Sequence, residues 1–214
     1  GSGFKIAMRD LEIRGAGNLL GAEQHGHMQA VGYDLYCKML DEAVKEAKGI
    51  KQQEEFETSV DLELNAFIPP KYIPNEYQKL DIYKRIAGIE SQEEYEDMLE
   101  ELLDRFGEPP KAVENLLAIA ALKALAHRVY ITEIKQTGND VKITMFKRAK
   151  LDPAGFPKIL EKYRNNLKMH LEEPPYFQVS LKGRRPKETL DVLEVLNSIL
   201  TDFQSLLEES KTPM

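Results

Sequence analysis

Hydrophobic and polar positions follow two different periods along this chain. Residues 59–68 place apolar side chains at every second position, which is the period of a half-buried strand, and Pro69 follows it. Residues 76–87, 93–106 and 111–127 instead repeat apolar positions every three or four residues, as amphipathic helices do. We expect a strand followed by three helices that pack together.

Local signals mark the ends of these helices. Ser91 and Glu94 form a capping box for the second helix, and Gly107 ends it. Pro109 and Pro110 set up the first turn of the third helix. In the first helix, the pattern predicts the following inward positions: Tyr77, Leu80, Ile86 and either Ile82 or Tyr83.

After residue 128 the pattern changes to short strands. Thr137-Gly138-Asn139-Asp140 is a strong hairpin signal, and Pro174-Pro175 separates a second pair of strands. The expected elements are strands 129–135 and 140–147, a short helix 154–163, strands 167–171 and 176–181, and a long closing helix 184–209. This order predicts an α+β fold, in which a mostly antiparallel sheet packs with several helices over residues 59–214.

The N-terminal quarter has another character. Residues 4–49 combine an irregular stretch from Arg9 to Gly26, rich in glycine, with an amphipathic helix at 31–48, and we expect a helical hairpin-like appendage there. Residues 50–58 are polar without a period and indicate a linker. Gly1-Ser2-Gly3 resembles the scar left by removal of an expression tag, so the chain is expected to be a piece of a longer protein.

Charge is distributed in blocks. The 214 residues carry a net charge of −7, but residues 54–110 hold 5 basic and 16 acidic side chains, whereas residues 111–187 hold 16 and 7. Such blocks either close onto each other in the fold or mark partner surfaces. Cys37 is the lone cysteine, which fits a reducing cytoplasm, and no apolar run approaches the ~20 residues that span a bilayer.

No catalytic constellation is visible. The glycines at 15, 17 and 21 do not match the dinucleotide fingerprint, and no Gly-Lys-Ser/Thr sequence exists to hold phosphates. His25 and His27 lack further metal ligands nearby, and Cys37 lies in a predicted helix without a neighbouring base. We therefore expect a non-enzymatic chain without a cofactor or metal of its own.

Two long stretches carry a family resemblance. RDLEIRGAGNLLGAEQHGH, followed by VGYDLYCKMLDEAV, resembles the translocation motif that bacterial transcription-repair coupling factors share with the helicase RecG. ETSVDLELNAFIPPKYIP, KLDIYKRIA and LLDRFGEPP resemble the C-terminal domain of the same coupling factors. RecG lacks that domain, so the joint resemblance is to the coupling-factor family.

The resemblance implies roles for the parent protein. Its motor would use ATP and magnesium to translocate on double-stranded DNA and push stalled RNA polymerase from a lesion. By motif match, Arg14 and Gln24 would couple the ATP cycle to movement. The nucleotide-binding motifs of the family lie upstream of this segment, which implies that this chain alone does not hydrolyse ATP.

The resemblance also implies regulation by the C-terminal domain. In the family this domain folds back on a UvrB-like N-terminal module and covers the surface that recruits UvrA. An interface that must open is expected to use charged, exposed contacts, and the acidic helix that ends in Glu101, Asp104 and Arg105, within the LLDRFG motif, fits this requirement. The alternative is a solvated helix face anchored by Phe106. The rival function is a nucleic-acid-binding accessory domain within segment 111–187, using these basic residues: Lys147, Arg148, Lys150, Arg184, Arg185 and Lys187.

Overall fold

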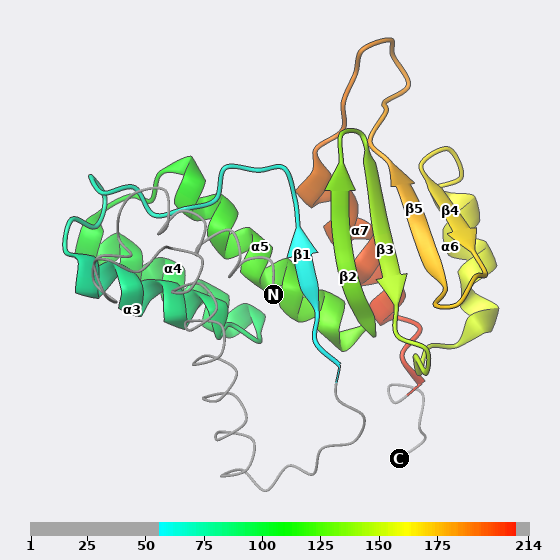
Figure 1. Cartoon of the computed structure of the whole chain (residues 1–214), viewed down its shortest axis with the longest axis horizontal. Helices are drawn as coiled ribbons and strands as arrows, with labels where there is room; N and C mark the ends of the chain where they lie inside the picture. Colours follow the sequence, from blue (N-terminus) through cyan, green and yellow to red (C-terminus); the bar gives the residue numbers. More distant parts are fainter. Residues whose placement is uncertain (1–55, 209–214) are drawn as a thin grey trace, which may run out of the picture. The chain divides into compact units, whose positions relative to one another are not determined.

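A computed structural model describes residues 56–208 of the chain (Figure 1). Backbone contacts divide these residues into two compact units. A helical unit consists of Asn65–Ala120, and a sheet unit combines Phe56–Leu64 with residues 121–208. The boundary between the units lies at residues 120 and 121, inside one helix, whereas the charge blocks change at residue 111. The charge blocks and the units therefore do not coincide.

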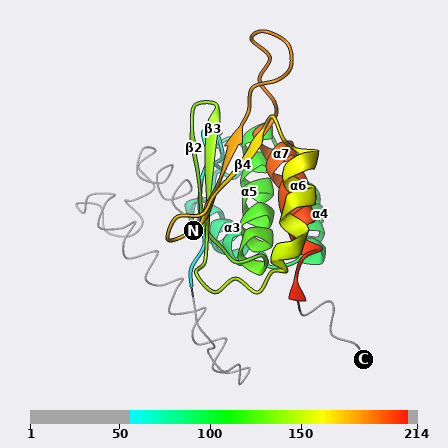
Figure 2. The same cartoon turned by 90° about the vertical axis from the view of Figure 1, so that its right-hand side faces the viewer.

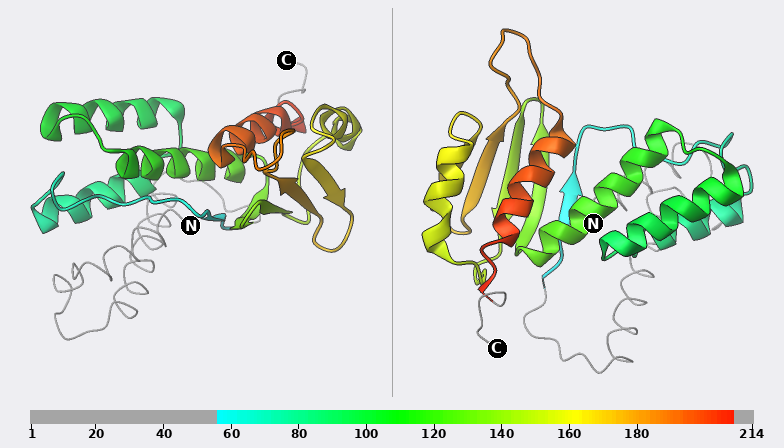
Figure 3. Two further views of the ribbon diagram at one scale, coloured as in Figure 1. Left: turned by 90° about the horizontal axis from the view of Figure 1, so that it is seen from above. Right: turned by 180° about the vertical axis from the view of Figure 1, so that it is seen from behind.

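The helical unit contains the predicted helices as α3 (Glu76–Ala87), α4 (Gln92–Phe106) and the first part of α5 (Lys111–Arg128) (Figure 3). All three lie within one or two residues of the predicted bounds. Their apolar faces meet in a core that includes these buried side chains: Ile68, Ile82, Tyr83, Ile86, Met98, Leu102, Val113, Leu116 and Leu117. The three helices pack together as expected.

The sheet unit has five strands in the order β1-β2-β3-β5-β4. Only the β1–β2 pair is parallel, and the other three pairs are antiparallel. The strands are β1 (Ser59–Asp61), β2 (Ile131–Thr137), β3 (Asp140–Met145), β4 (Leu167–His170) and β5 (Tyr176–Ser180). The predicted α+β class is confirmed, as are the hairpin at Gly138 and the second strand pair.

One face of this sheet is covered by helices. The last part of α5, α6 (Phe156–Lys162) and α7 (Val192–Gln204) all lie on the same side of the strands (Figure 2). A short 3₁₀ turn at Pro153–Gly155 leads into α6. Buried apolar side chains alternate with exposed polar ones along β3 and β5, because successive strand residues point to opposite faces. The core therefore lies between the sheet and these helices.

The strand predicted over residues 59–68 was too long. β1 has three residues, yet Leu62, Ala66 and Ile68 remain buried, so the alternation of apolar positions continues without sheet pairing. The backbone finds other partners there: the Glu63 amide donates to Gln136 Oε1 at 2.8 Å, and the Ile68 amide donates to the Tyr83 hydroxyl at 2.8 Å. Alternation indicates burial on one side, which an extended loop can satisfy as well as a strand.

The long closing helix was also predicted with the wrong start. α7 begins at Val192, because Asp191 caps it by accepting from the Glu194 amide at 3.1 Å. The residues before it form a loop in which Lys187 has a φ of 65°, a conformation that no helix contains. Within α7, Leu196, Ile199, Leu200 and Phe203 are fully buried at the spacing of one helix face.

The inward face predicted for α3 contains one error. Tyr77 is 72% exposed, whereas Lys79 is 1% exposed and lies 3.6 Å from the Glu76 carboxylate. The long aliphatic stem of lysine explains its burial, since such a side chain can line a core and still reach a carboxylate with its ammonium group. Ile82, Tyr83 and Ile86 are buried as expected.

Candidate functional site

The C-terminal end of α4 carries the three residues that the sequence suggests as an interaction site. The helix begins as predicted, because the Ser91 hydroxyl accepts from the Glu94 amide at 3.1 Å. Glu94 accepts in return from the Glu90 amide at 2.9 Å, one residue earlier than a standard capping box. Gly107 ends the helix with a φ of 86° and a ψ of −169°.

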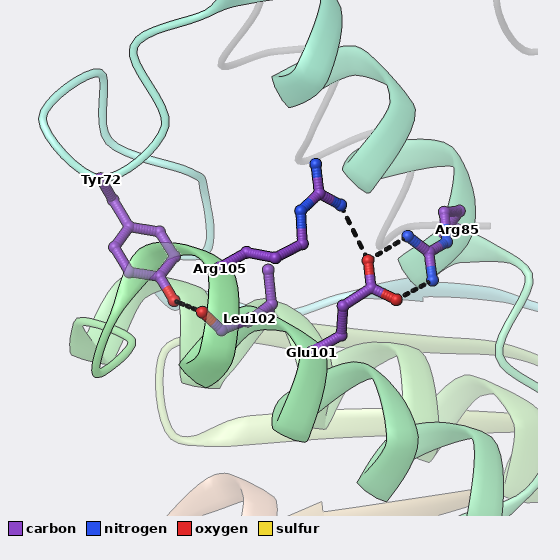
Figure 4. Close-up of polar contacts among 5 residues, drawn as sticks. All are labelled: Tyr72, Arg85, Glu101, Leu102 and Arg105. Atoms are coloured by element: carbon purple, nitrogen blue, oxygen red, sulfur yellow. Dashed lines mark hydrogen bonds and ion pairs between the residues drawn. The ribbon is translucent and has the colours of Figure 1, made fainter.

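Tyr72 supports this end of α4 from the loop that precedes α3. Its hydroxyl oxygen lies 3.2 Å from the Leu102 carbonyl oxygen (Figure 4). It also lies 2.8 Å from the Gly107 carbonyl oxygen, directly after the end of the helix. Its ring is 5.8 Å from the Phe106 ring, and burial raises the pKa of its hydroxyl above the usual 10.0. The tyrosine thus remains a neutral donor to carbonyls that a helix end would otherwise leave to water.

Glu101 lies at the centre of an ion-pair network (Figure 4). Arg85, from α3, contacts both of its carboxylate oxygens, with Nη2 2.5 Å from Oε1. Arg105, one turn further along α4, donates from Nη1 to Oε2 at 2.8 Å. The bidentate geometry fixes the Arg85 side chain, whereas Arg105 makes one bond to Glu101 and also lies over the Phe106 ring at 4.9 Å.

The network changes the ionisation of its members. The hydrogen bond from Arg85, followed by that from Arg105, lowers the pKa of Glu101 from 4.5 to about 2. The same hydrogen bond to Glu101 raises the pKa of Arg85. Both carboxylate oxygens of Glu101 therefore already accept hydrogen bonds from arginines, and the main role of Glu101 is to hold these two guanidinium groups in place.

This network predicts a pH-dependent contribution to stability. Because the pKa of Glu101 is lower in the folded state than in the unfolded state, its ionised carboxylate stabilises the fold above about pH 4.5. This stabilisation is lost as the pH falls toward 2. Because all three side chains contact solvent, we expect Glu101→Gln to cost only about 0.5–1 kcal/mol at pH 7.

Urea titrations at pH 7 and at pH 2.5 check this expectation. The difference in free energy of unfolding between the unsubstituted chain and Glu101→Gln should shrink at the lower pH. A control, Glu93→Gln, changes an exposed acid with no partner among residues 56–208 and should show no such convergence. A difference that stays constant across this range would contradict the role given to the ion pair.

Asp104 differs from its neighbours. Its carboxylate is exposed and has no hydrogen-bond or ion-pair partner within the described part of the chain. Leu103 beside it is 52% exposed. The end of α4 therefore presents the Asp104 carboxylate, the Leu103 side chain and the Arg105 guanidinium group. Arg85, on the neighbouring helix α3, adds a second guanidinium group.

Sequence reasoning found part of this cluster and missed the rest. The structure brings Glu101 and Arg105 into direct contact, and Asp104 has no partner among residues 56–208. Arg85 and Tyr72 were missed, because Arg85 is 16 residues from Glu101 and Tyr72 is 30 residues from Leu102, and no local pattern links them to α4. Phe106 is half-buried, so the alternative interpretation of it as an anchor is compatible with the same geometry.

The basic residues of the rival interpretation do not form one surface. Lys147, Arg148 and Lys150 follow β3, while Arg184, Arg185 and Lys187 follow β5. Since β3 and β5 are antiparallel, the two groups lie at opposite ends of the sheet (Figure 1). Arg148 also rests 5.8 Å over the Phe146 ring, where it serves packing as well as charge.

Other predicted features remain predictions. Arg14, Gln24, the segment 4–49, and residues 50–55 of the expected linker lie outside the described residues. Across residues 56–208, no group of three or more His, Cys, Asp or Glu side chains is placed to hold a metal ion. Over the same residues, none of the helices is both long and apolar enough to cross a bilayer.

Comparison with known proteins decides the family. Residues 62–156 match the TRCF domain family. The transcription-repair-coupling factor of Bacillus subtilis is 43% identical over 198 residues, which cover 90% of this chain, and that of Staphylococcus haemolyticus is 48% identical over 151 residues, which cover 70%. The chain belongs to the transcription-repair coupling factor family.

The solved structures agree with this assignment. A crystal structure of the C-terminal domain of transcription-repair coupling factor is similar with a TM-score of 0.63 and 28% identity, covering 75% of this chain and 99% of that one. The chain spans only 17% of the Bacillus subtilis coupling factor and 13% of the Staphylococcus haemolyticus one. It therefore represents a coupling-factor C-terminal domain.

Proposed function

We propose that this chain is a non-catalytic, autoinhibitory interaction module of a coupling factor. In this proposal the end of α4 binds a UvrB-like module in the N-terminal part of the parent protein and covers the surface that recruits UvrA. The parent would be an ATP- and magnesium-dependent translocase on double-stranded DNA that displaces RNA polymerase. Arg14 and Gln24 would belong to its translocation machinery.

The exposed carboxylate of Asp104, which has no partner in the described part of the chain, carries the proposal together with the exposed Leu103 beside it. A contact that must open during repair is best made of polar groups around a small apolar centre, because such interfaces separate at modest cost. The bonds from Tyr72 and the ion pair with Arg85 hold this end of α4 rigid before binding, which lowers the entropy lost on association.

Charge reversal at Asp104 tests the proposal. We expect Asp104→Lys to weaken binding of the 214-residue chain to the separately prepared UvrB-like module about tenfold, measured by calorimetry, because the substitution places a cation where the proposed interface uses a carboxylate. Arg105 is less suitable, because its reversal would also break the ion pair with Glu101.

A matched control is available on the same helix. Glu93→Lys makes the same change of charge at an exposed site in the first turn of α4 and should leave binding unchanged. Unchanged binding by Asp104→Lys, or equal losses in both variants, would move the interface away from the end of α4.

A further inference from the structure

The loop between β5 and α7 is a concentrated source of positive charge. We call residues Lys182–Thr189 the basic loop. It contains Lys182, Arg184, Arg185 and Lys187, with Glu188 as its single acid. The loop extends beyond the end of the sheet at which β5 ends (Figure 1).

The basic loop has a defined backbone. Lys182 and Thr189 form an antiparallel bridge at its base, and the Gly183 amide donates to the Glu188 carbonyl at 2.9 Å. At the tip, the Glu188 amide donates to the Arg185 carbonyl at 3.1 Å, and Lys187 has a φ of 65°. These bonds describe a short hairpin that is ordered before any ligand binds.

Its one acid does not neutralise the cations. The Glu188 carboxylate accepts from the Arg185 backbone amide at 3.0 Å, so it closes the turn. No basic side chain of the loop forms an ion pair with any residue from 56 to 208, and all four are exposed. Cations without partners on a projecting hairpin give a local positive potential on a chain whose net charge is −7.

The chemistry of the loop selects among polyanions. Its only apolar side chain is Pro186, whereas protein interfaces usually depend on buried aromatic or aliphatic anchors. It has no aromatic ring on which an unpaired base could stack, as single-strand binders require. Phosphates of a duplex need only exposed cations at suitable spacing.

We propose that the basic loop binds the phosphate backbone of double-stranded DNA, without reading its sequence. Arg184, Arg185 and Lys187 supply the contacts at the tip, and Lys182 supplies one at the base. This function is separate from the end of α4, which belongs to the helical unit. Loss of one function therefore leaves the other measurable.

Salt-dependent binding of a 20-base-pair DNA of random sequence to the 214-residue chain tests this inference, with fluorescence anisotropy as the readout. We expect the double variant Arg184→Gln/Lys187→Gln to lower affinity at 50 mM salt at least about tenfold and to reduce the slope of log affinity against log salt by about 2. The matched control, Lys147→Gln/Lys150→Gln, removes the same charge at the opposite end of the sheet and should change little.

Three results would overturn the proposal. These are an absence of duplex binding by the unsubstituted 214-residue chain at 50 mM salt, an equal loss of duplex affinity in the two double variants, and binding of a single-stranded 20-mer that is as tight as that of the duplex. Loop-dependent binding of a poly-glutamate peptide without duplex binding would assign the loop to an acidic protein instead. Thermal unfolding followed by circular dichroism should be the same for all three chains, because the substituted side chains are exposed.

Discussion

Replacing Phe203 by alanine is expected to destabilise the sheet unit by about 3–5 kcal/mol, the largest effect of any substitution considered in this chain. Phe203 is fully buried, with its ring 4.9 Å from that of Phe177 and 5.5 Å from that of Phe156 in an edge-to-face contact. These three rings join β5, α6 and α7 on the covered side of the sheet. Truncation removes apolar area and leaves a cavity that rigid neighbours fill poorly.

Urea unfolding followed by far-ultraviolet circular dichroism measures this loss, since the chain has no tryptophan to serve as a fluorescent probe. Phe203→Leu should cost clearly less, because most of the volume is retained. Gln204→Ala, at the exposed neighbouring position, should be close to neutral. A loss below 1 kcal/mol for Phe203→Ala would show that the three rings are not the centre of this core.

Replacing Gly107 by alanine is expected to cost about 1–3 kcal/mol through the backbone alone. Its φ of 86° and ψ of −169° lie in a region that is essentially restricted to glycine. No atom lies within 4 Å of the position that a Cβ would occupy, so the cost does not come from a clash. Relief of the strain would shift the end of α4, including the carbonyl to which Tyr72 donates.

Gly88 provides the matched comparison at the end of α3. Its φ is −85°, and an added Cβ would lie 3.6 Å from two carbonyl oxygens, which is ordinary contact. We expect Gly88→Ala to be neutral or to stabilise by up to about 1 kcal/mol, since alanine restricts the unfolded chain. If Gly107→Ala and Gly88→Ala changed the urea midpoint equally, the backbone strain expected for alanine at position 107 would be contradicted.

The contrast between α4 and α7 shows where sequence patterns succeed. Ser91 and Gly107 fix both ends of α4 through bonds to residues a few positions away, so local sequence was sufficient. For α7 the predicted start at Arg184 was wrong, because the helix begins after the Asp191 cap. The apolar positions in α7 lie on one buried face, but the polar residues before Asp191 form a loop that extends beyond the sheet (Figure 1), which the pattern did not indicate.

The proposed interaction site at the end of α4 shows a different limit. Glu101, Asp104 and Arg105 could be named as candidates from the sequence, because they are charged residues close together at the end of a predicted helix. Their different roles could not be named, since these depend on Arg85, which comes from another helix and occupies the Glu101 carboxylate. The structure pairs Glu101 with Arg85 and Arg105, whereas Asp104 has no partner among residues 56–208.

By itself the sequence determined the fold class, the helices α3 to α5, both strand pairs and the family. Caps, turns and apolar periods are short-range features, and family motifs are read directly along the chain. The tertiary structure decided the length of β1, the start of α7 and the separation of the basic residues into two groups. It also decided the pairing of Arg85 with Glu101. These features depend on which distant segments meet, and the free energy of such contacts comes from burial and geometry that a linear pattern does not contain.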